Sequence, residues 1–392
     1  MGVRMAGARE VAVIGAGMSP FGDLKRTAKS LFSEAFSEAL ASVDRGLDPA
    51  HIQEAYIGNM GFGGGQIGNL AALMTEHARM LHVPARKVEN ACASSGYAFR
   101  DAYLAVKSGV VDLAVAGGVE VMNDVSDVRK RFWLGVSGDT EWERLAGLTF
   151  PGVYAMMAVR HMHEFGTTRE QMAAVAVKNH ANGARNPKAQ FRKEITIEKA
   201  LSGTTVAYPF TLYDCCGTTD GASCVILAGK DVAGKYTDAP VWVLGSGAAS
   251  DHLAVHDRES MTRLDATVRA AEDAYAQAGI AAKDVDVAEV HDCFTIAEIL
   301  AVEDLGFAAK GEGGRLAAEG ITARDGRLPV NPSGGLKAKG HPLGATGTAQ
   351  VHEMFLQLRG AAGDRQVRDP EIGLCHNVGG SGATCAVHLF GR

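Results

Sequence analysis

The chain carries the same series of short segments twice, once near each end of the sequence. Three pairs recur in the same order: "VAVIGAG" (11–17) with "VWVLGSG" (241–247), "EAYIGNM" (54–60) with "VDVAEVHDCF" (285–294), and "NACASSGYA" (90–98) with "GHPLGATGTA" (340–349). Each pair alone is a weak similarity, but its ordered recurrence indicates a duplication. The fold is therefore expected to be one in which two similar halves pack together.

Within each half, short apolar runs rich in valine and isoleucine alternate with longer helical patterns. This alternation predicts an α/β fold with buried strands. The predicted strands cover 9–17, 54–60, 86–91, 111–122, 241–247, 285–294, 371–380 and 381–391. The predicted helices cover 29–46, 69–81, a stretch from Cys92 to about Ser108, 263–279, and a stretch opening within 340–349.

Three parts follow from this pattern. Residues 1–122 together with 223–240 form the expected amino-terminal half, and residues 241–392 form the carboxy-terminal half. Residues 123–222 hold most of the charged and irregular sequence, including "RKRFWLGVSGDTEWERLAG". We expect this stretch to be an insertion that covers one face of the molecule.

Composition and charge exclude several classes of function. The net charge is -6 with a sequence pI near 6.1, and the chain shows no basic stripe, so nucleic acid is not an expected partner. No uncharged apolar run is long enough to span a bilayer, and the amino terminus lacks a signal-peptide apolar region. The seven cysteines include no C-x-x-C pair, which favours reduced thiols in a cytosolic protein over disulfides or structural zinc.

A glycine-rich loop near the amino terminus is not a dinucleotide site. The segment "GAGMSPFG" (15–22) lacks the third glycine at the required place, and Pro20 interrupts the expected helix start. We therefore expect neither a nicotinamide nor a flavin there.

Cys92 lies between a short extended approach and an expected helix start. Backbone N–H groups and the helix dipole at such a position stabilise a thiolate, as a nucleophile requires. The alternative is a small buried hydrophobic residue, a common fate of free cysteine. Residue type and position alone leave both interpretations open.

Other segments favour the reactive interpretation. His341 is surrounded by five glycines within "NPSGGLKAKGHPLGATG" (331–347), and so many glycines are costly unless the backbone must approach another group closely. In "HDCF" (291–294), His291 and Cys293 project to the same side of an extended chain at the end of an apolar run. A buried polar pair at a strand end is the plain alternative for these two residues.

The segment "CHNVGGSG" (375–382) places His376 beside a run of backbone amides in a tight turn. Such a turn suits an oxyanion. Asn377 and Ser381 in the same segment are interpreted as turn residues.

These motifs resemble those of the thiolase superfamily over nearly the whole chain. The similar segments are "NACASSG" (90–96), "GGVEVM" (117–122), "CGTTDGAS" (216–223), "NPSGGLKAKGHPLGATG" (331–347), "HDCF" (291–294) and "HNVGG" (376–380). The last two depart from the commonest thiolases and are similar to the sterol-carrier-protein-type and archaeal-type branches. The resemblance implies a thiolase fold: two βαβαβαββ-type halves in a five-layered αβαβα arrangement, with an inserted loop domain.

The resemblance also implies Claisen chemistry on coenzyme A thioesters, reversible between condensation and thiolytic cleavage. Cys92 takes the role of the acyl-carrying nucleophile and His341 that of its base, while Cys293 exchanges the α-proton of the second substrate. His376 occupies the place where the commonest thiolases carry a terminal cysteine, so the resemblance implies a catalytic position for it as well.

Two oxyanion sites follow from the same motif matching. His291 and His341 are assigned to the enolate oxygen. Backbone N–H groups of Cys92, Val378 and Gly379 are assigned to the acyl-enzyme intermediate.

No metal or organic cofactor is implied, since coenzyme A enters as a substrate. Arg129, Lys130 and Arg131 are basic residues that could meet its phosphates, but a charge run is more often a solvated face. The resemblance further implies a homodimer or a dimer of dimers, and a small accessory protein with a zinc ribbon and an OB fold.

Three other functions remain open from sequence: a ketoacyl synthase, a retro-aldolase, and a non-catalytic acyl-thioester-binding subunit. Retention of Cys92 and Cys293 favours thiolase over each of them. The acyl chain accepted is not readable from the sequence.

Overall fold

The computed structural model describes residues 9–62 and 66–392. Residues 1–8 and 63–65, which belong to the predicted amino-terminal half, lie outside the described part. The first half contains β1 (Val11–Met18), α1 (Ala28–Ala41), β2 (Glu54–Gly58), α2 (Leu70–His77), β3 (Ala85–Val88), α3 (Ser94–Lys107), β4 (Leu113–Glu120), β7 (Gly221–Gly229) and α8 (Lys230–Ala233).

The second half repeats this plan. It contains β8 (Val241–Ser250), α9 (Asp265–Ala278), β9 (Val287–Glu289), α10 (Thr295–Asp304), α11 (Gly313–Ala318), α12 (Gly335–Ala338), α13 (Thr346–Leu358), β10 (Ile372–Gly379) and β11 (Thr384–Gly391). Between the halves lie α4 (Asp127–Gly135), α5 (Phe150–Phe165), α6 (Arg169–Ala184), α7 (Ile197–Leu201), β5 (Thr205–Ala207) and β6 (Phe210–Thr211).

The strand order confirms the predicted duplication. Among the described residues, nine strands form one sheet in the order β3-β2-β4-β7-β1-β8-β11-β10-β9. The two sides mirror each other, because β7 and β11 pair antiparallel with both neighbours while β4–β2 and β10–β9 are parallel. An isolated parallel bridge from Ala288 to Val330 occupies the position that β3 holds in the first half. The halves join where β1 pairs with β8 over two residues.

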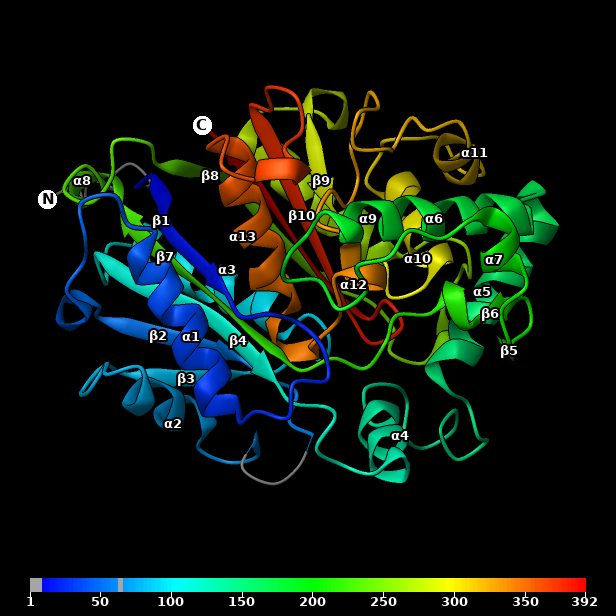
Figure 1. Cartoon of the computed structure of the whole chain (residues 1–392), viewed down its shortest axis with the longest axis horizontal. Coiled ribbons are helices and arrows are strands. Elements are labelled where there is room, and N and C mark those ends of the chain that lie inside the picture. The colour runs from blue at the N-terminus through cyan, green and yellow to red at the C-terminus, as the bar shows by residue number, and fades with distance from the viewer. Residues whose placement is uncertain (1–8, 63–65) are drawn as a thin grey trace, which may run out of the picture.

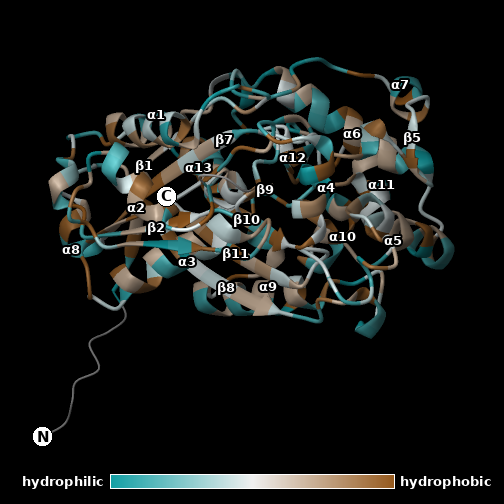
Figure 2. Ribbon diagram, turned by 90° about the horizontal axis from the view of Figure 1, so that it is seen from below, coloured by the Kyte–Doolittle hydropathy of each residue, from teal (hydrophilic) through white to brown (hydrophobic). Residues whose placement is uncertain are grey.

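The helices complete the five layers that the family resemblance implied. Helix α1 packs on β1 and β7, and α9 packs on β8 and β11, so these helices form the outer layers. Helices α3 and α13 contact each other and strands of both halves, which places them in the middle (Figure 1). Figure 2 shows this order from α1 at the top, through β1, α13 and α3, to β8 and α9 at the bottom.

The two central helices meet at glycines. A Cβ at Gly96 would lie 2.7 Å from the Asn377 side-chain oxygen, and one at Gly347 would collide with the backbone nitrogen of Gly96. Because neither position has room for a side chain, α3 and α13 cross with their backbones nearly in contact. This close crossing brings the segments that precede both helices to one place.

The insertion 123–222 contains the helices α4, α5, α6 and α7, joined by irregular segments. Val153 and Tyr154 of α5 and Met172 of α6 are buried in one apolar cluster with Phe294 and Leu336 of the second half. The insertion therefore covers the helices α10 and α12, which lie beside the HDCF segment.

Helix α1 ends earlier than the predicted helix over 29–46. Its last residue is Ala41, and the Ser42 hydroxyl accepts a hydrogen bond from the Ala16 N–H at 2.8 Å while donating to the Ala39 carbonyl. The side chain thereby ties the helix end to strand β1. A serine that bonds to nearby backbone in this way favours a helix end over continuation.

Candidate active site

Cys92 lies in the turn between β3 and α3. The preceding residue, Ala91, has a left-handed backbone with φ of 50°, which is uncommon for a residue other than glycine. The Ser94 hydroxyl donates to the Ala91 carbonyl at 2.6 Å and holds this turn. Strained backbone of this kind is frequent at functional sites, where surrounding contacts maintain it.

The structure brings Cys92 together with His291 and His341. The sulfur of Cys92 and a nitrogen of each ring all lie within 4.8 Å of one another. The two imidazole rings are nearly perpendicular, at 86°, with centroids 5.0 Å apart. Both Nε2 atoms are buried without a hydrogen-bond partner. Buried polar atoms are almost always paired, so two unpaired ones beside a thiol indicate a place for a substrate.

Hydrogen bonds assign the protonation of the His341 ring. The Thr346 hydroxyl donates to the Pro342 carbonyl at 3.0 Å, so its oxygen accepts from His341 Nδ1–H at 2.7 Å. Nε2 then carries the lone pair. The Thr219 hydroxyl also accepts from the His341 backbone N–H at 2.9 Å, which fixes the residue. His341 thus presents a base toward Cys92.

The His291 ring has the opposite tautomer. Its Nδ1 accepts from the Val378 backbone N–H at 3.3 Å, so the proton of the neutral ring resides on Nε2. The unpartnered Nε2–H is therefore a hydrogen-bond donor directed into the site. A thiol and two imidazoles also resemble a zinc donor set, but this tautomer presents a proton where a metal needs a lone pair.

Burial keeps all three groups neutral. It raises the pKa of the Cys92 thiol to about 12, with Glu120 adding to the effect. It lowers the pKa of His341 to about 3, with Lys339 contributing, and it holds the pKa of His291 well below its usual range. At neutral pH the site contains a thiol and a free base rather than an ion pair.

Of the three amides predicted for the oxyanion, that of Cys92 faces the sulfur, whereas those of Val378 and Gly379 are engaged elsewhere. The sulfur interacts with the backbone N–H of Gly380 and with that of Cys92 itself, and both interactions favour the thiolate. The N–H of Val378 is bonded to His291 and is therefore not free for an oxyanion. Gly379 pairs with Thr384 across β10 and β11. Gly380 has φ of 63°, a left-handed conformation that glycine adopts without strain.

Cys293 follows His291 by two residues and lies beside the same site. Cys293 is 6% exposed, and its thiol interacts with the Tyr154 side chain. Burial, the neighbouring thiols of Cys216 and Cys92, and the carboxyl of Asp292 raise its pKa well above the usual value. The structure therefore places Cys293 near Cys92, and its role in proton transfer stays a prediction.

His376 lies outside the cluster. Its Nδ1 accepts from the His291 backbone N–H at 3.3 Å, and its Nε2 bonds to the Thr267 hydroxyl at 2.9 Å. Both ring nitrogens are occupied, so this side chain has none to offer a substrate. Alternation along β10 sends His376 to one face of the strand and Asn377 to the other, which corrects the expected catalytic position of His376.

Asn377 is the residue that the sequence interpretation undervalued. Its side-chain oxygen accepts from the Gly96 N–H at 3.2 Å, and its nitrogen donates to the Cys92 carbonyl at 3.0 Å. The same nitrogen lies 3.3 Å from Nδ1 of His291. Asn377 thereby ties the nucleophile turn, the start of α3 and the HDCF segment together, a role beyond that of a turn residue.

Glu120, at the end of β4, was not singled out from the sequence. Its carboxylate accepts from the N–H groups of Met60 at 2.9 Å, Gly61 at 2.9 Å and Gly344 at 3.0 Å. Burial nevertheless raises its pKa to about 7. The carboxylate connects the first half to the loop after His341. A buried acid at the end of an apolar strand was the available sequence signal.

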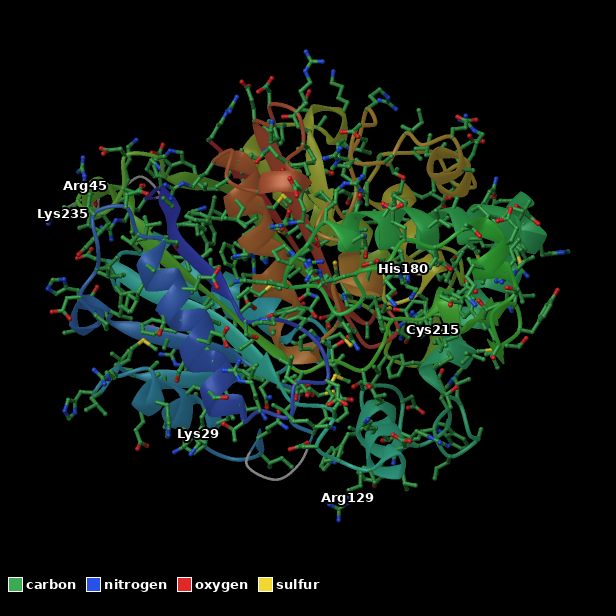
Figure 3. All side chains as sticks on the ribbon, in the orientation of Figure 1. Lys29, Arg45, Arg129, His180, Cys215 and Lys235 are labelled. Atoms are coloured by element: carbon green, nitrogen blue, oxygen red, sulfur yellow. The ribbon has the colours of Figure 1, made fainter. Side chains whose placement is uncertain are left out.

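Apolar side chains surround Cys92 on the remaining side. Phe62, Met122 and Leu343 form a buried cluster with it, and Trp133 and Leu134 of α4 pack against this cluster. In the basic run 129–131 on α4, the Lys130 ammonium group donates a hydrogen bond to the side-chain oxygen of Asn123 at 3.1 Å. Arg129 is exposed and points away from the body at the lower edge of Figure 3.

Comparison with known proteins agrees with this geometry. The family model "Thiolase, N-terminal domain" matches residues 11–231, and "Thiolase C-terminal domain-like" matches 247–392. An acetyl-CoA acetyltransferase of Methanothermobacter thermautotrophicus is 50% identical, over 98% of this chain and 100% of that protein. Human sterol carrier protein 2 is 33% identical over 96% of this chain and 71% of its own length.

The fold is shared with solved structures at lower identity. The "Ltp2-ChsH2(DUF35) aldolase" superposes with a TM-score of 0.84 at 24% identity, covering 98% of both chains. Among the described residues, no helix is both long and apolar enough to cross a membrane. The paired halves, the thiol between two imidazoles and the full-length similarity lead to one conclusion: this chain belongs to the thiolase family.

Proposed function

We propose that this protein is an acyltransferase that catalyses the thiolase reaction on coenzyme A thioesters through an acyl group carried on Cys92. The observation that carries the proposal is the convergence of the Cys92 sulfur with one ring nitrogen of His291 and one of His341 within 4.8 Å, in a site where the Nε2 atoms of both rings have no hydrogen-bond partner. One of these atoms is a base and the other a donor, which is the pair that acyl transfer and enolate formation require.

In the first half-reaction, Nε2 of His341 takes the Cys92 proton and the sulfur attacks the thioester carbonyl. The carbon–sulfur bond to Cys92 forms and that to coenzyme A breaks, with the departing thiolate taking the proton back from His341. The N–H groups of Cys92 and Gly380 hold the oxyanion. One such donor contributes about 2.7–4 kcal/mol to catalysis.

In the second half-reaction, the Cys293 thiolate removes the α-proton of a second acyl-CoA. The enolate oxygen accepts from His291 Nε2–H at every stage, whereas His341 donates only while its Nε2 holds a proton. The enolate carbon then attacks the acyl carbonyl on Cys92, the bond from that carbonyl to the Cys92 sulfur breaks, and the 3-ketoacyl-CoA is released. The Cys92 thiolate takes the proton that Cys293 removed, which restores the Cys92 thiol and the Cys293 thiolate. Thiolytic cleavage is the reverse sequence. All proton transfers are covered by these side chains, so we propose no further cofactor.

Other assignments follow from the same proposal. His376 acts as a positioning residue, because it holds the His291 backbone without facing the substrate. The relative named acetyl-CoA acetyltransferase and the apolar wall around Cys92 favour a short acyl group such as acetyl.

Assembly and organisation belong to the proposal as well. The similar aldolase structure is named for two components, Ltp2 and ChsH2(DUF35), which supports an accessory protein here. We further propose a cytosolic homodimer or dimer of dimers, and the division into 1–122 with 223–240, 123–222 and 241–392.

The retro-aldolase, ketoacyl synthase and scaffold functions are less favoured. A protein that transfers no acyl group does not need a nucleophile, its base and a second thiol together in one buried site. The similarity to the aldolase structure is 24% in sequence, which is too low to indicate a shared reaction.

The test is mass spectrometry after brief exposure to acetyl-CoA, other acyl-CoAs and 3-ketoacyl-CoAs. Cys92 is the only cysteine of the tryptic peptide 88–100, "VENACASSGYAFR", so an adduct there is unambiguous. We expect an acyl adduct on this peptide that is absent in Cys92→Ala and retained in Cys224→Ala, whose thiol is buried in β7. The absence of any adduct from every thioester would contradict the proposal.

A further inference from the structure

Tyr154 connects the insertion to both reactive thiols. It lies on α5 and is 1% exposed. Its hydroxyl donates to the Gly380 carbonyl at 3.3 Å, in the turn whose N–H faces Cys92. Tyr154 and Cys293 also lie in the same buried cluster, where the two side chains interact. One buried tyrosine thus contacts a residue of each half-reaction.

Aromatic packing fixes this hydroxyl. The Tyr154 ring stacks on Phe294 with centroids 4.8 Å apart at 27°, and the Phe210 ring also stacks on Phe294, with centroids 5.6 Å apart at 9°. Phe294 follows Cys293 directly, so the two insertion aromatics hold the backbone of the HDCF segment. A ring held in this way loses little conformational entropy when its hydroxyl bonds to a neighbour.

The acceptor of the resting hydrogen bond is also fixed. Arg258 donates to the Ser381 carbonyl at 2.6 Å and to the Ser381 hydroxyl at 3.1 Å. This anchors the Gly380–Ser381 turn independently of Tyr154. The turn can therefore keep its shape while the hydroxyl of Tyr154 changes its acceptor.

We propose that Tyr154 is a positioning residue for the proton-transfer thiol: its hydroxyl bonds to the Gly380 carbonyl at rest and donates to the Cys293 sulfur when that thiol ionises. This inference rests on the proposed function of Cys293. The insertion would then supply the one hydrogen bond that makes the second half-reaction accessible at neutral pH.

Among the groups around Cys293, Tyr154 is the one suited to stabilise its ionised thiol. The titratable groups that face its thiol are Cys216, Cys92, Asp292 and Tyr154. The first three and burial all raise its pKa, whereas the hydrogen bond with Tyr154 lowers it. Arg258 is the cation that faces Tyr154 itself. A donor to a buried anion is worth more than a donor to a neutral group, so its removal is measurable.

The first experiment measures the Cys293 thiol directly, without turnover. Cys293 is the only cysteine of the tryptic peptide 284–310, so its alkylation by iodoacetamide can be followed against pH in a Cys92→Ala background. We expect Tyr154→Phe to move the alkylation profile upward by about one pH unit or more. Tyr103→Phe is the matched control, because that buried hydroxyl contacts Lys107 and lies in another core cluster.

The second experiment separates the two half-reactions in the otherwise unmodified enzyme. Tyr154→Phe should slow deuterium incorporation into the methyl group of acetyl-CoA at least about tenfold, while acyl-adduct formation on Cys92 proceeds at the parent rate. An unchanged alkylation profile, or an equal loss in both half-reactions, would overturn the proposal. Failure of the proposed function gives a different result. The parent enzyme then forms no Cys92 adduct, but the alkylation profiles of the parent and of Tyr154→Phe still differ by the expected shift.

Discussion

The segments that lead into the two central helices use the same backbone arrangement for different chemistry. Cys92 follows Ala91, with φ of 50°, and His341 follows Gly340, with φ of 119°. In both halves a left-handed residue therefore turns the next side chain toward the crossing of α3 and α13. One half presents a thiol there, and the other presents an imidazole.

The two segments differ in the residues that come directly after the reactive side chain. Helix α3 begins at Ser94, two residues after Cys92, whereas Pro342 and a short turn separate His341 from α13, which begins at Thr346. The added turn supplies the Pro342 carbonyl and the Thr346 hydroxyl that set the histidine tautomer. Duplication thus preserved the backbone geometry, while divergence of a few residues produced a complementary acid and base.

Removing the base from the second segment should have the largest effect. We expect His341→Asn to slow acylation of Cys92 about a thousandfold, since a positioned general base contributes about 10²–10⁴-fold. His352→Asn is the control, because that histidine is buried as well but lies on α13 and pairs with Glu38. Rapid-quench acylation with acetyl-CoA measures both. Equal rates in the two variants would show that His341 is not the base.

His291→Ala should affect turnover far more than folding. Loss of its Nε2–H removes one donor to the enolate, which costs about 10²–10³ in kcat. Deuterium exchange into acetyl-CoA should fall by this factor while the Cys92 adduct still forms. Thermal denaturation provides the folding control. An activity matching that of the parent would make the assignment of His291 wrong.

Exchanging the two left-handed residues sharpens the comparison. Gly340→Ala places a Cβ 2.8 Å from the Thr219 side chain at a φ that only glycine tolerates well, so we expect a loss of about 1–3 kcal/mol in the free energy of unfolding. Ala91→Gly relieves strain instead, and we expect a change of less than about 1 kcal/mol. Urea denaturation measures both. An equal loss in Ala91→Gly would contradict the left-handed conformation of Ala91, because glycine adopts that conformation more easily than alanine.

The mildest test changes only the pH and leaves the protein unmodified: it follows how fast iodoacetamide alkylates Cys92. Burial raises the pKa of this thiol to about 12, so the thiolate fraction rises about tenfold per pH unit between pH 7 and 9. In the absence of substrate, the iodoacetamide rate on peptide 88–100 should climb through this window without a plateau. A plateau below pH 7 would instead indicate a thiolate–imidazolium pair.

The sequence identified the reactive side chains better than their surroundings. Cys92, His291 and His341 converge as the motifs implied. The donors around them were harder to predict, because Val378 is engaged by His291 and the N–H facing the sulfur belongs to Gly380. Adjacent amides in one turn point in different directions, and their directions depend on backbone angles that a one-letter sequence does not encode.

The alternation of side chains along β10 shows a second point that the sequence could not predict. A strand over 371–380 implies that His376 and Asn377 face opposite sides, yet the sequence does not say which side holds the site. The structure places Asn377 against Cys92 and His376 against Thr267. Tyr154 was not found from sequence, because a tyrosine within an insertion has no local pattern that links it to thiols in the two halves.

The sequence alone determined the duplication, the α/β class and which candidate side chains, Cys92, His291 and His341, meet in one site, since these depend on local periodicity and on residue types at recurring positions. Tertiary structure alone decided the opposite tautomers of His291 and His341, the neutral state of Cys92 and the hydrogen bonds of Asn377 and Tyr154. These properties depend on burial and on partners separated by long stretches of chain. Such partners meet only where the two halves close around α3 and α13.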